Sequence, residues 1–325
     1  MGGVLTQSVN KAEYMGEQTS LLDFFELMKP RVMRLAIFTA IVGMVASQEP
    51  IHPIIMIAAV ILIGLGAGAS GALNMWWDAD IDSLMSRTDN RPIPSGIIKK
   101  EDALYFGIFL AFLSVSFLGL FTNYLAAFTL AFTILFYIVI YSMWLKRWTP
   151  QNIVIGGAAG AFPPLIGWTV CTGTIELESL LMFLIIFIWT PPHFWALSLF
   201  VNSDYGKAKV PMLTVTHGKA HTKFQILLYS VALVSVTLIT AFTTLGGLFY
   251  LLASIVLNTY FIYLAIRVYI QDDEDHSRDR VHYDKKLFLF SISYLFTIFC
   301  FILFEAVIDI FNVNSINYNF SSMLF

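Results

Sequence analysis

The sequence is most notably short of charged side chains. Only 13% of its 325 residues are Asp, Glu, Lys or Arg, against about 25% in a typical soluble domain, while 58% are hydrophobic. This balance excludes an ordinary water-soluble protein. The two cysteines are too few for a disulfide scaffold, and an aromatic content of 15% argues against disorder. The composition therefore indicates an integral membrane protein.

The amino-terminal segment lacks the pattern of a targeting sequence. Residues 1–28 contain Glu13, Glu17 and Asp23, and they show neither the basic and apolar regions of a secretory signal nor the acid-free, Arg-rich pattern of a transit peptide. We expect no cleaved leader here, and we expect residues 1–28 to form a cytoplasmic segment.

Charge is absent altogether from two runs of 43 residues, 103–145 and 224–266. Each run is about twice the roughly 20 residues that cross a bilayer as a helix. Polar or glycine residues divide each run near its middle, at Thr122-Asn123 in the first and at Gly246-Gly247 in the second. Each run therefore predicts two transmembrane helices joined by a tight turn.

Further apolar stretches bring the expected number of spans to nine. Helices are the natural state for them, because a helix satisfies its backbone hydrogen bonds internally and lipid offers no other partners. These stretches are residues 33–47, 54–77, 151–170, 179–201 and 287–308. The prediction is an all-α membrane protein with a single transmembrane domain over 29–311 and an external tail over 312–325.

The positions of Lys and Arg support this count. With nine spans, all 19 basic residues fall before the first span or in alternate loops that lie on the same face. Because basic residues accumulate on the cytoplasmic side of a membrane, we expect a cytoplasmic amino terminus and an external carboxyl terminus.

An acidic motif follows the second predicted span. At 100° per residue, Asn74, Asp78 and Asp82 lie within 80° of one another on a helix, while Asp80 points away. Two carboxylates and an amide this close favour a hard cation among them, and Mg²⁺ is often held by one or two carboxylates together with substrate phosphates. The motif predicts a magnesium site, although a solvated acidic helix end would show the same residues.

Two arginines, Arg87 and Arg91, lie in the proline-containing loop that follows the motif. Arginine suits phosphate oxygens. Either arginine alone is also explained by a basic loop that only fixes topology. Together with the carboxylates, they predict a site for the diphosphate of a lipid-like molecule.

These motifs resemble the UbiA-type membrane prenyltransferase superfamily, typified by the 4-hydroxybenzoate polyprenyltransferases. The first acidic motif of that superfamily, Asn-x-x-x-Asp-x-x-x-Asp, matches Asn74, Asp78 and Asp82. The resemblance narrows to the protohaem IX farnesyltransferase (haem O synthase) family through three segments in order, within residues 74–92, 149–157 and 189–205.

The resemblance implies a prenyltransferase-type helical bundle in a bacterial inner membrane, with its active site facing the cytoplasm. It implies transfer of the farnesyl group of farnesyl diphosphate to a vinyl group of protohaem IX (haem B, a substrate), with addition of water to give haem O and diphosphate. It also implies Mg²⁺ as cofactor, contact with haem A synthase or with assembly factors of a terminal oxidase, and no nucleic-acid partner.

Further diphosphate contacts are implied by the same resemblance. Lys146 and Arg147 end the fourth predicted span, at a position that faces the diphosphate in the superfamily. Lys29 and Arg31, at the start of the first span, are expected to contribute similarly.

The sequence departs from the wider superfamily after the sixth span. Many members carry a second Asp-rich motif there, whereas this chain has His193 in an apolar helix and Asp204-Tyr205 in the loop. We assign these three residues to haem or to a second polar site. His193 is equally explained as a hydrogen-bonded packing residue.

Two rival functions remain open at this point. A prenyltransferase acting on an aromatic quinone precursor should show the complete second Asp-rich motif. A transporter should place its charged residues near the bilayer centre, whereas the carboxylates here lie at one edge.

Overall fold

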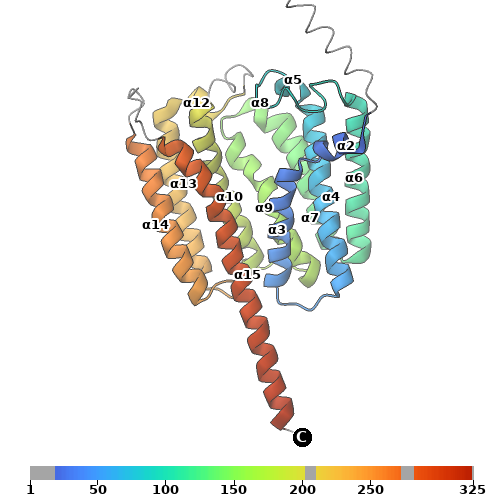
Figure 1. Ribbon diagram of the computed structural model, residues 1–325, viewed down its shortest axis with the longest axis vertical. Helices are drawn as coiled ribbons and strands as arrows, with labels where there is room; N and C mark the ends of the chain where they lie inside the picture. Colours follow the sequence, from blue (N-terminus) through green and yellow to red (C-terminus); the bar gives the residue numbers. More distant parts are fainter. Residues whose placement is uncertain (1–18, 202–209, 272–281, 324–325) are drawn as a thin grey trace, which may run out of the picture.

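The computed structural model describes residues 19–201, 210–271 and 282–323, and every element within these ranges is a helix. The long helices run side by side as one bundle (Figure 1). The elements are α2 (Leu21–Leu27), α3 (Pro30–Ala46), α4 (Pro53–Trp77), α5 (Ala79–Asp82), α6 (Lys100–Phe121), α7 (Tyr124–Leu135), the π-helix η1 (Phe136–Leu145), α8 (Lys146–Trp148), α9 (Asn152–Thr172), α10 (Leu177–Phe200), α12 (Leu213–Thr216), α13 (Gly218–Thr240), α14 (Leu248–Ile270) and α15 (Tyr283–Met323).

The two charge-free runs each form a helical hairpin, as predicted. In the first, the Asn123 side chain accepts a hydrogen bond from the Ala126 N–H (2.9 Å) and caps α7. In the second, the buried Glu305 carboxylate of α15 accepts a hydrogen bond from the Tyr250 N–H (2.9 Å) at the start of α14. Both turns thereby satisfy backbone donors that a helix cannot satisfy by itself.

Eight helices in the described part of the chain are long and apolar enough to cross a membrane. The first predicted span, 33–47, forms α3, whose 17 residues make a helix about 26 Å long, at the short end of the range for a span. The ninth predicted span forms α15, which runs on to Met323 beyond the rest of the bundle (Figure 1). The expected tail over 312–325 is therefore helical as far as Met323.

The bundle has two apolar cores that meet at α3 and α9. One core lies among α10, α13, α14 and α15 and includes Trp195, Tyr250 and Phe299. The other lies among α3, α4, α6, α7 and α9. Helix α3 contributes to both, for example through Val42 to the first and Met44 to the second.

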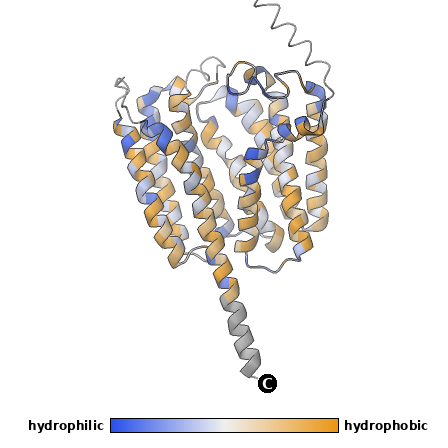
Figure 2. Ribbon diagram, viewed as in Figure 1, coloured by the Kyte–Doolittle hydropathy of each residue, from blue (hydrophilic) through white to orange (hydrophobic). Residues whose placement is uncertain are grey.

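Polar and apolar residues are separated along the bundle. Apolar ribbon covers the length of the helices, while hydrophilic residues concentrate at the end that holds α2, α5 and α12 (Figure 2). Large apolar side chains such as Phe112 and Leu120 of α6 are exposed on the bundle, as expected for a surface that faces lipid. The protein is a multi-pass membrane protein with one strongly polar end.

Candidate active site

The acidic motif lies where α4 gives way to α5. We expected one helix to run through the whole motif. Instead, α4 ends at Trp77, and Asp78 has a ψ of 6°. The spacing of the hydrogen bonds nevertheless persists, because the Asp78 N–H donates to the Asn74 carbonyl (2.9 Å) and the Asp82 N–H donates to the Asp78 carbonyl (2.8 Å). The side chains of Asn74, Asp78 and Asp82 therefore converge, and each residue is at most 4% exposed.

Asp80 points away from this group, as the spacing predicts. Its side chain is 60% exposed and lies 2.8 Å from Arg147 Nη2. Asp80 lies beyond the end of the span. Its pKa is below the usual range, mainly because this guanidinium donates hydrogen bonds to its carboxylate. Asp80 is thus occupied by a surface ion pair.

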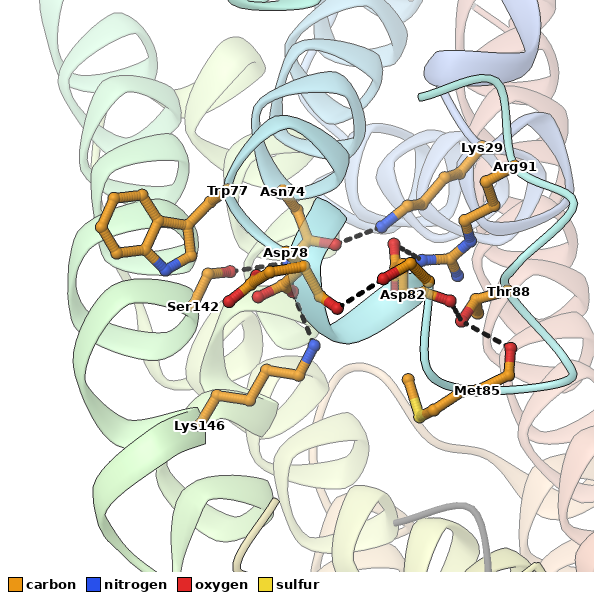
Figure 3. A network of polar contacts seen from close by, with 12 residues as sticks. Lys29, Asn74, Trp77, Asp78, Asp82, Met85, Thr88, Arg91, Ser142 and Lys146 are labelled. Atoms are coloured by element: carbon orange, nitrogen blue, oxygen red, sulfur yellow. Dashed lines mark hydrogen bonds and ion pairs between the residues drawn. The ribbon is translucent and has the colours of Figure 1, made fainter. Parts of the chain in front are cut away.

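Three cationic side chains reach the buried motif from three different elements (Figure 3). Lys146 Nζ, at the start of α8, donates to Asp78 Oδ2 (2.6 Å). Arg91 Nη1, in the loop after α5, donates to Asp82 Oδ2 (2.5 Å), and Lys29 Nζ donates to Asn74 Oδ1. Arg147 Nη2 also lies within 3.8 Å of Asp78 Oδ1, so the structure brings four of the six predicted diphosphate residues to the predicted metal residues.

Lys29 reaches the motif from an unusual backbone position. It lies between α2 and α3 in the left-handed region, with φ 55° and ψ 62°, a conformation that costs energy in a residue with a side chain. Burial, followed by the nearby positive charges of Arg91 and Lys146, lowers the pKa of Lys29 to about 7, while Asp82 and Asp78 oppose the shift. The buried motif thus faces several positive charges on half-buried side chains.

A π-helix positions the residues that face the motif from the fourth span. In η1 the Ser142 hydroxyl donates to the Tyr137 carbonyl five residues earlier (2.9 Å). Asn74 Nδ2 donates both to Ser142 Oγ (2.8 Å) and to Asp78 Oδ2 (2.8 Å). Ser142 is a site residue that the sequence did not reveal. It lies in a charge-free run, and the π-helix leaves no periodic pattern there, although a π-helix often marks a functional site.

The loop after α5 is braced against the motif. The Thr88 hydroxyl donates to the Asp82 carbonyl (2.9 Å) and Thr88 is buried, which fixes the start of the loop that carries Arg91. Arg87 and Arg31 are exposed, and among the described residues no contact joins either of them to the buried motif.

The donor set suits a magnesium ion shared with a substrate. Asp78 Oδ1 is buried and has no hydrogen-bond partner, and Arg147 Nη2 lies 3.8 Å from it. Within the described ranges no three His, Cys, Asp or Glu side chains gather as a complete metal centre. Mg²⁺ is usually bound by one or two carboxylates together with substrate phosphates and water. Two carboxylates and an amide therefore fit the predicted ion.

An apolar cavity of about 120 Å³ opens beside Lys29 and extends between α3, α4, α7 and α9. Met28, Met33 and Tyr137 are among the residues that line it. Small residues of α4, Gly66 and Ala67 among them, also line the cavity, and the Leu130 side chain packs over Gly66. A charged cluster at the mouth of an apolar cavity is the arrangement that an amphiphilic diphosphate requires.

His193 is packed between rings on α10 and α15. Its ring stacks on Trp189 (4.3 Å between centroids) and on Phe288 (4.7 Å). Its Nδ1 lies 2.6 Å from Ser291 Oγ, and His193 is 8% exposed. These contacts describe a hydrogen-bonded packing residue, so contact of His193 with haem stays a prediction. The other two residues of that prediction, Asp204 and Tyr205, lie outside the described residues.

The chain is similar to known proteins over almost its whole length. Residues 36–307 match the model of the UbiA prenyltransferase family. A protein from Roseobacter denitrificans named protoheme IX farnesyltransferase is 53% identical, over 93% of this chain and 96% of its own length. One of the same name from Cereibacter sphaeroides (strain ATCC 17025) is 54% identical, over 88% of this chain and 92% of its own.

Solved structures show the same fold at low sequence identity. A structure described as that of digeranylgeranylglyceryl phosphate synthase has a TM-score of 0.72 and 19% identity, covering 88% of this chain and 98% of its own. A UbiA homologue from Archaeoglobus fulgidus, bound to GPP and Mg²⁺, has a TM-score of 0.59 and 14% identity, covering 86% of this chain and 99% of its own.

Proposed function

The chain belongs to the UbiA prenyltransferase family, and from this premise we propose that it transfers the farnesyl group of farnesyl diphosphate to a vinyl group of protohaem IX, giving haem O. The chain is a membrane-embedded prenyltransferase. The choice of substrates is carried by one observation, which is that relatives 52–54% identical over most of both chains bear the name protoheme IX farnesyltransferase.

The buried motif supports this function through charge. Asn74, Asp78 and Asp82 would hold Mg²⁺, which when bound neutralises the diphosphate and makes it a better leaving group. Lys146 and Arg91 lie against the two carboxylates, where they can turn to the diphosphate oxygens. Their positive charge stabilises the negative charge that develops as the C1–O bond breaks, and it does so best in a site closed to water.

The other half of the reaction needs an apolar surface and no covalent nucleophile. As the C1–O bond breaks, positive charge spreads over the allylic carbons, and an aromatic face such as that of Tyr137 in the cavity wall stabilises it. The vinyl carbon of haem bonds to C1, which leaves a cation next to the porphyrin. Water adds to this cation and loses a proton, which gives a hydroxyethylfarnesyl group.

We place the site at the cytoplasmic face of a bacterial inner membrane. The proposal has nine spans, a single domain over 29–311, a cytoplasmic amino terminus and an external carboxyl terminus. It is supported by the polar end of the bundle, where the motif lies (Figure 2), and by the bacterial relatives. It also includes contact with a haem A synthase or with oxidase assembly factors, which would take up the product.

A cellular test separates this function from transfer to a quinone precursor. The gene is expressed in bacteria that lack their own haem O synthase, and the extracted haems are analysed by chromatography and absorption spectroscopy. Our proposal predicts haem O in these cells and none in cells that express the Asp82→Asn variant. Membranes that prenylate 4-hydroxybenzoate but leave haem unmodified would contradict it.

A further inference from the structure

The cavity beneath the motif has a closed end. Helices α3 and α9 lead away from the motif along the chain, whereas α4 and α7 lead toward it (Figure 1). On three of these helices, the lining residues furthest along the chain from the motif are Ile166 on α9, Ile63 on α4 and Leu130 on α7. Each of the three is at most 2% exposed. We call these three residues the floor.

Packed protein lies at the depth of the floor. The backbones of α3 and α9 touch on either side of Ile166: a Cβ on Gly43 would lie 2.0 Å from the Pro164 carbonyl oxygen, and one on Gly167 would lie 2.0 Å from that of Ala40. The floor residues belong to the same buried apolar cluster as Ala40 and its neighbours. A chain that enters beside Lys29 therefore meets packed side chains at this depth.

The depth of the cavity can be compared with prenyl chains. Eleven residues of α4 separate Asn74 from Ile63, which is about 16 Å at 1.5 Å per residue. An extended chain gains about 3.5 Å for every three bonds. The twelve-carbon backbone of a farnesyl group is then about 13 Å long, which is less than the depth of Ile63. A geranylgeranyl group is about 5 Å longer by the same measure and exceeds that depth.

The walls near the motif yield more easily than the floor. The open volume of about 120 Å³ is smaller than the roughly 300–1,000 Å³ of typical ligand sites, so an entering chain must displace side chains. Met28, next to Lys29, lines the part near the motif, and methionine adapts readily because it is unbranched. Ile63 and Ile166 are β-branched and stiff.

From this geometry we propose that the floor formed by Ile63, Leu130 and Ile166 selects a fifteen-carbon donor by excluding longer prenyl chains. This inference rests on the proposed function, since it concerns the donor of that same reaction. It adds the residues that set the length of the donor.

The test uses the purified full-length protein in detergent, with Mg²⁺ and without haem. Dissociation constants for farnesyl and geranylgeranyl diphosphate are measured by thermal shift for the wild type, Leu130→Ala and Ile166→Ala. Leu130 Cδ1 lies 2.7 Å from where a Gly66 Cβ would be, so truncating Leu130 opens space over Gly66. We expect the ratio of the two constants to shift toward geranylgeranyl diphosphate by about tenfold, the effect of a misfit in an apolar pocket.

Two further variants keep the result interpretable. Leu118→Ala removes an equally buried leucine of the same cluster that does not line the cavity, and it should leave the ratio unchanged. Gly160→Leu adds a side chain at a lining position where a Cβ meets nothing within 4 Å. It should weaken binding of farnesyl diphosphate by at least about tenfold while binding of five-carbon dimethylallyl diphosphate persists.

The outcomes separate this inference from the proposed function. Folded Leu130→Ala and Ile166→Ala proteins with the wild-type ratio would overturn it, as would a Gly160→Leu protein that binds all three diphosphates like the wild type. If the wild type binds farnesyl diphosphate but makes no haem O, the proposed acceptor fails while the binding ratios still decide the role of the floor. A wild type that binds no prenyl diphosphate contradicts both.

Discussion

Asp78→Asn and Asp80→Asn make the same chemical change two residues apart, and we expect losses of activity of very different size. Asp78 is fully buried, its Oδ2 accepts from Lys146 and Asn74, and its Oδ1 is left for a metal ion. Removing its charge removes a magnesium ligand, and a bound metal contributes several kcal/mol to stabilising the transition state. A loss of about 4 kcal/mol lowers kcat/KM about a thousandfold. Asp80 makes only a surface ion pair with Arg147, worth at most about 1 kcal/mol, so Asp80→Asn should lower kcat/KM less than about fivefold.

The assay measures haem O formed by each purified variant at several farnesyl diphosphate concentrations with Mg²⁺ present. Gel filtration and thermal unfolding establish that both variants are folded. An asparagine at position 78 can still accept a hydrogen bond from Lys146, so a large loss of stability is not expected. If Asp80→Asn proves as damaging as Asp78→Asn, the division of the motif into a buried group and an outward residue has no functional meaning.

Three further predictions concern residues around the motif and in the bundle. Ser142→Ala removes the hydroxyl that accepts from Asn74 and should lower kcat/KM by about 10- to 100-fold, as the loss of a residue that orients a metal ligand does; wild-type kinetics would exclude this positioning role. His193→Ala removes a buried ring stacked between two aromatic residues and should destabilise the protein by about 3 kcal/mol in thermal unfolding, whereas an unchanged midpoint with selectively weakened haem binding would favour contact with haem. Gly167→Ala places a Cβ 2.0 Å from the Ala40 carbonyl oxygen and should destabilise the bundle by about 2 kcal/mol or more through overpacking, an effect that a melting temperature equal to that of the wild type would refute.

Much of the fold was predictable because membrane helices leave a strong signal. The charge-free runs 103–145 and 224–266 and the polar turn at Thr122-Asn123 locate helices and connections directly. The convergence of Asn74, Asp78 and Asp82 followed from their four-residue spacing, which survives the break at Asp78 because the backbone hydrogen bonds keep their register.

The remaining features depend on long-range packing. Ser142 of the π-helix η1 contacts Asn74, which lies 68 positions away in the sequence. No local sequence pattern predicts this contact or the π-helix. The left-handed backbone of Lys29 is likewise imposed by the junction of α2 with α3. The sequence does not show that Arg91 and Lys29 contact the motif while Arg87 and Arg31 are exposed. The path of the backbone decides which basic residue of each pair turns inward.

The most direct test of the central claim is the product of the purified protein itself. The protein is incubated with farnesyl diphosphate, protohaem IX and Mg²⁺ in ¹⁸O-labelled water, and the haem is analysed by mass spectrometry. Our account predicts a haem enlarged by one farnesyl group and one hydroxyl group, with the hydroxyl oxygen carrying the label, and no such product from Asp78→Asn. Unmodified haem from the folded wild-type protein, or a farnesylated haem without labelled oxygen, would contradict it.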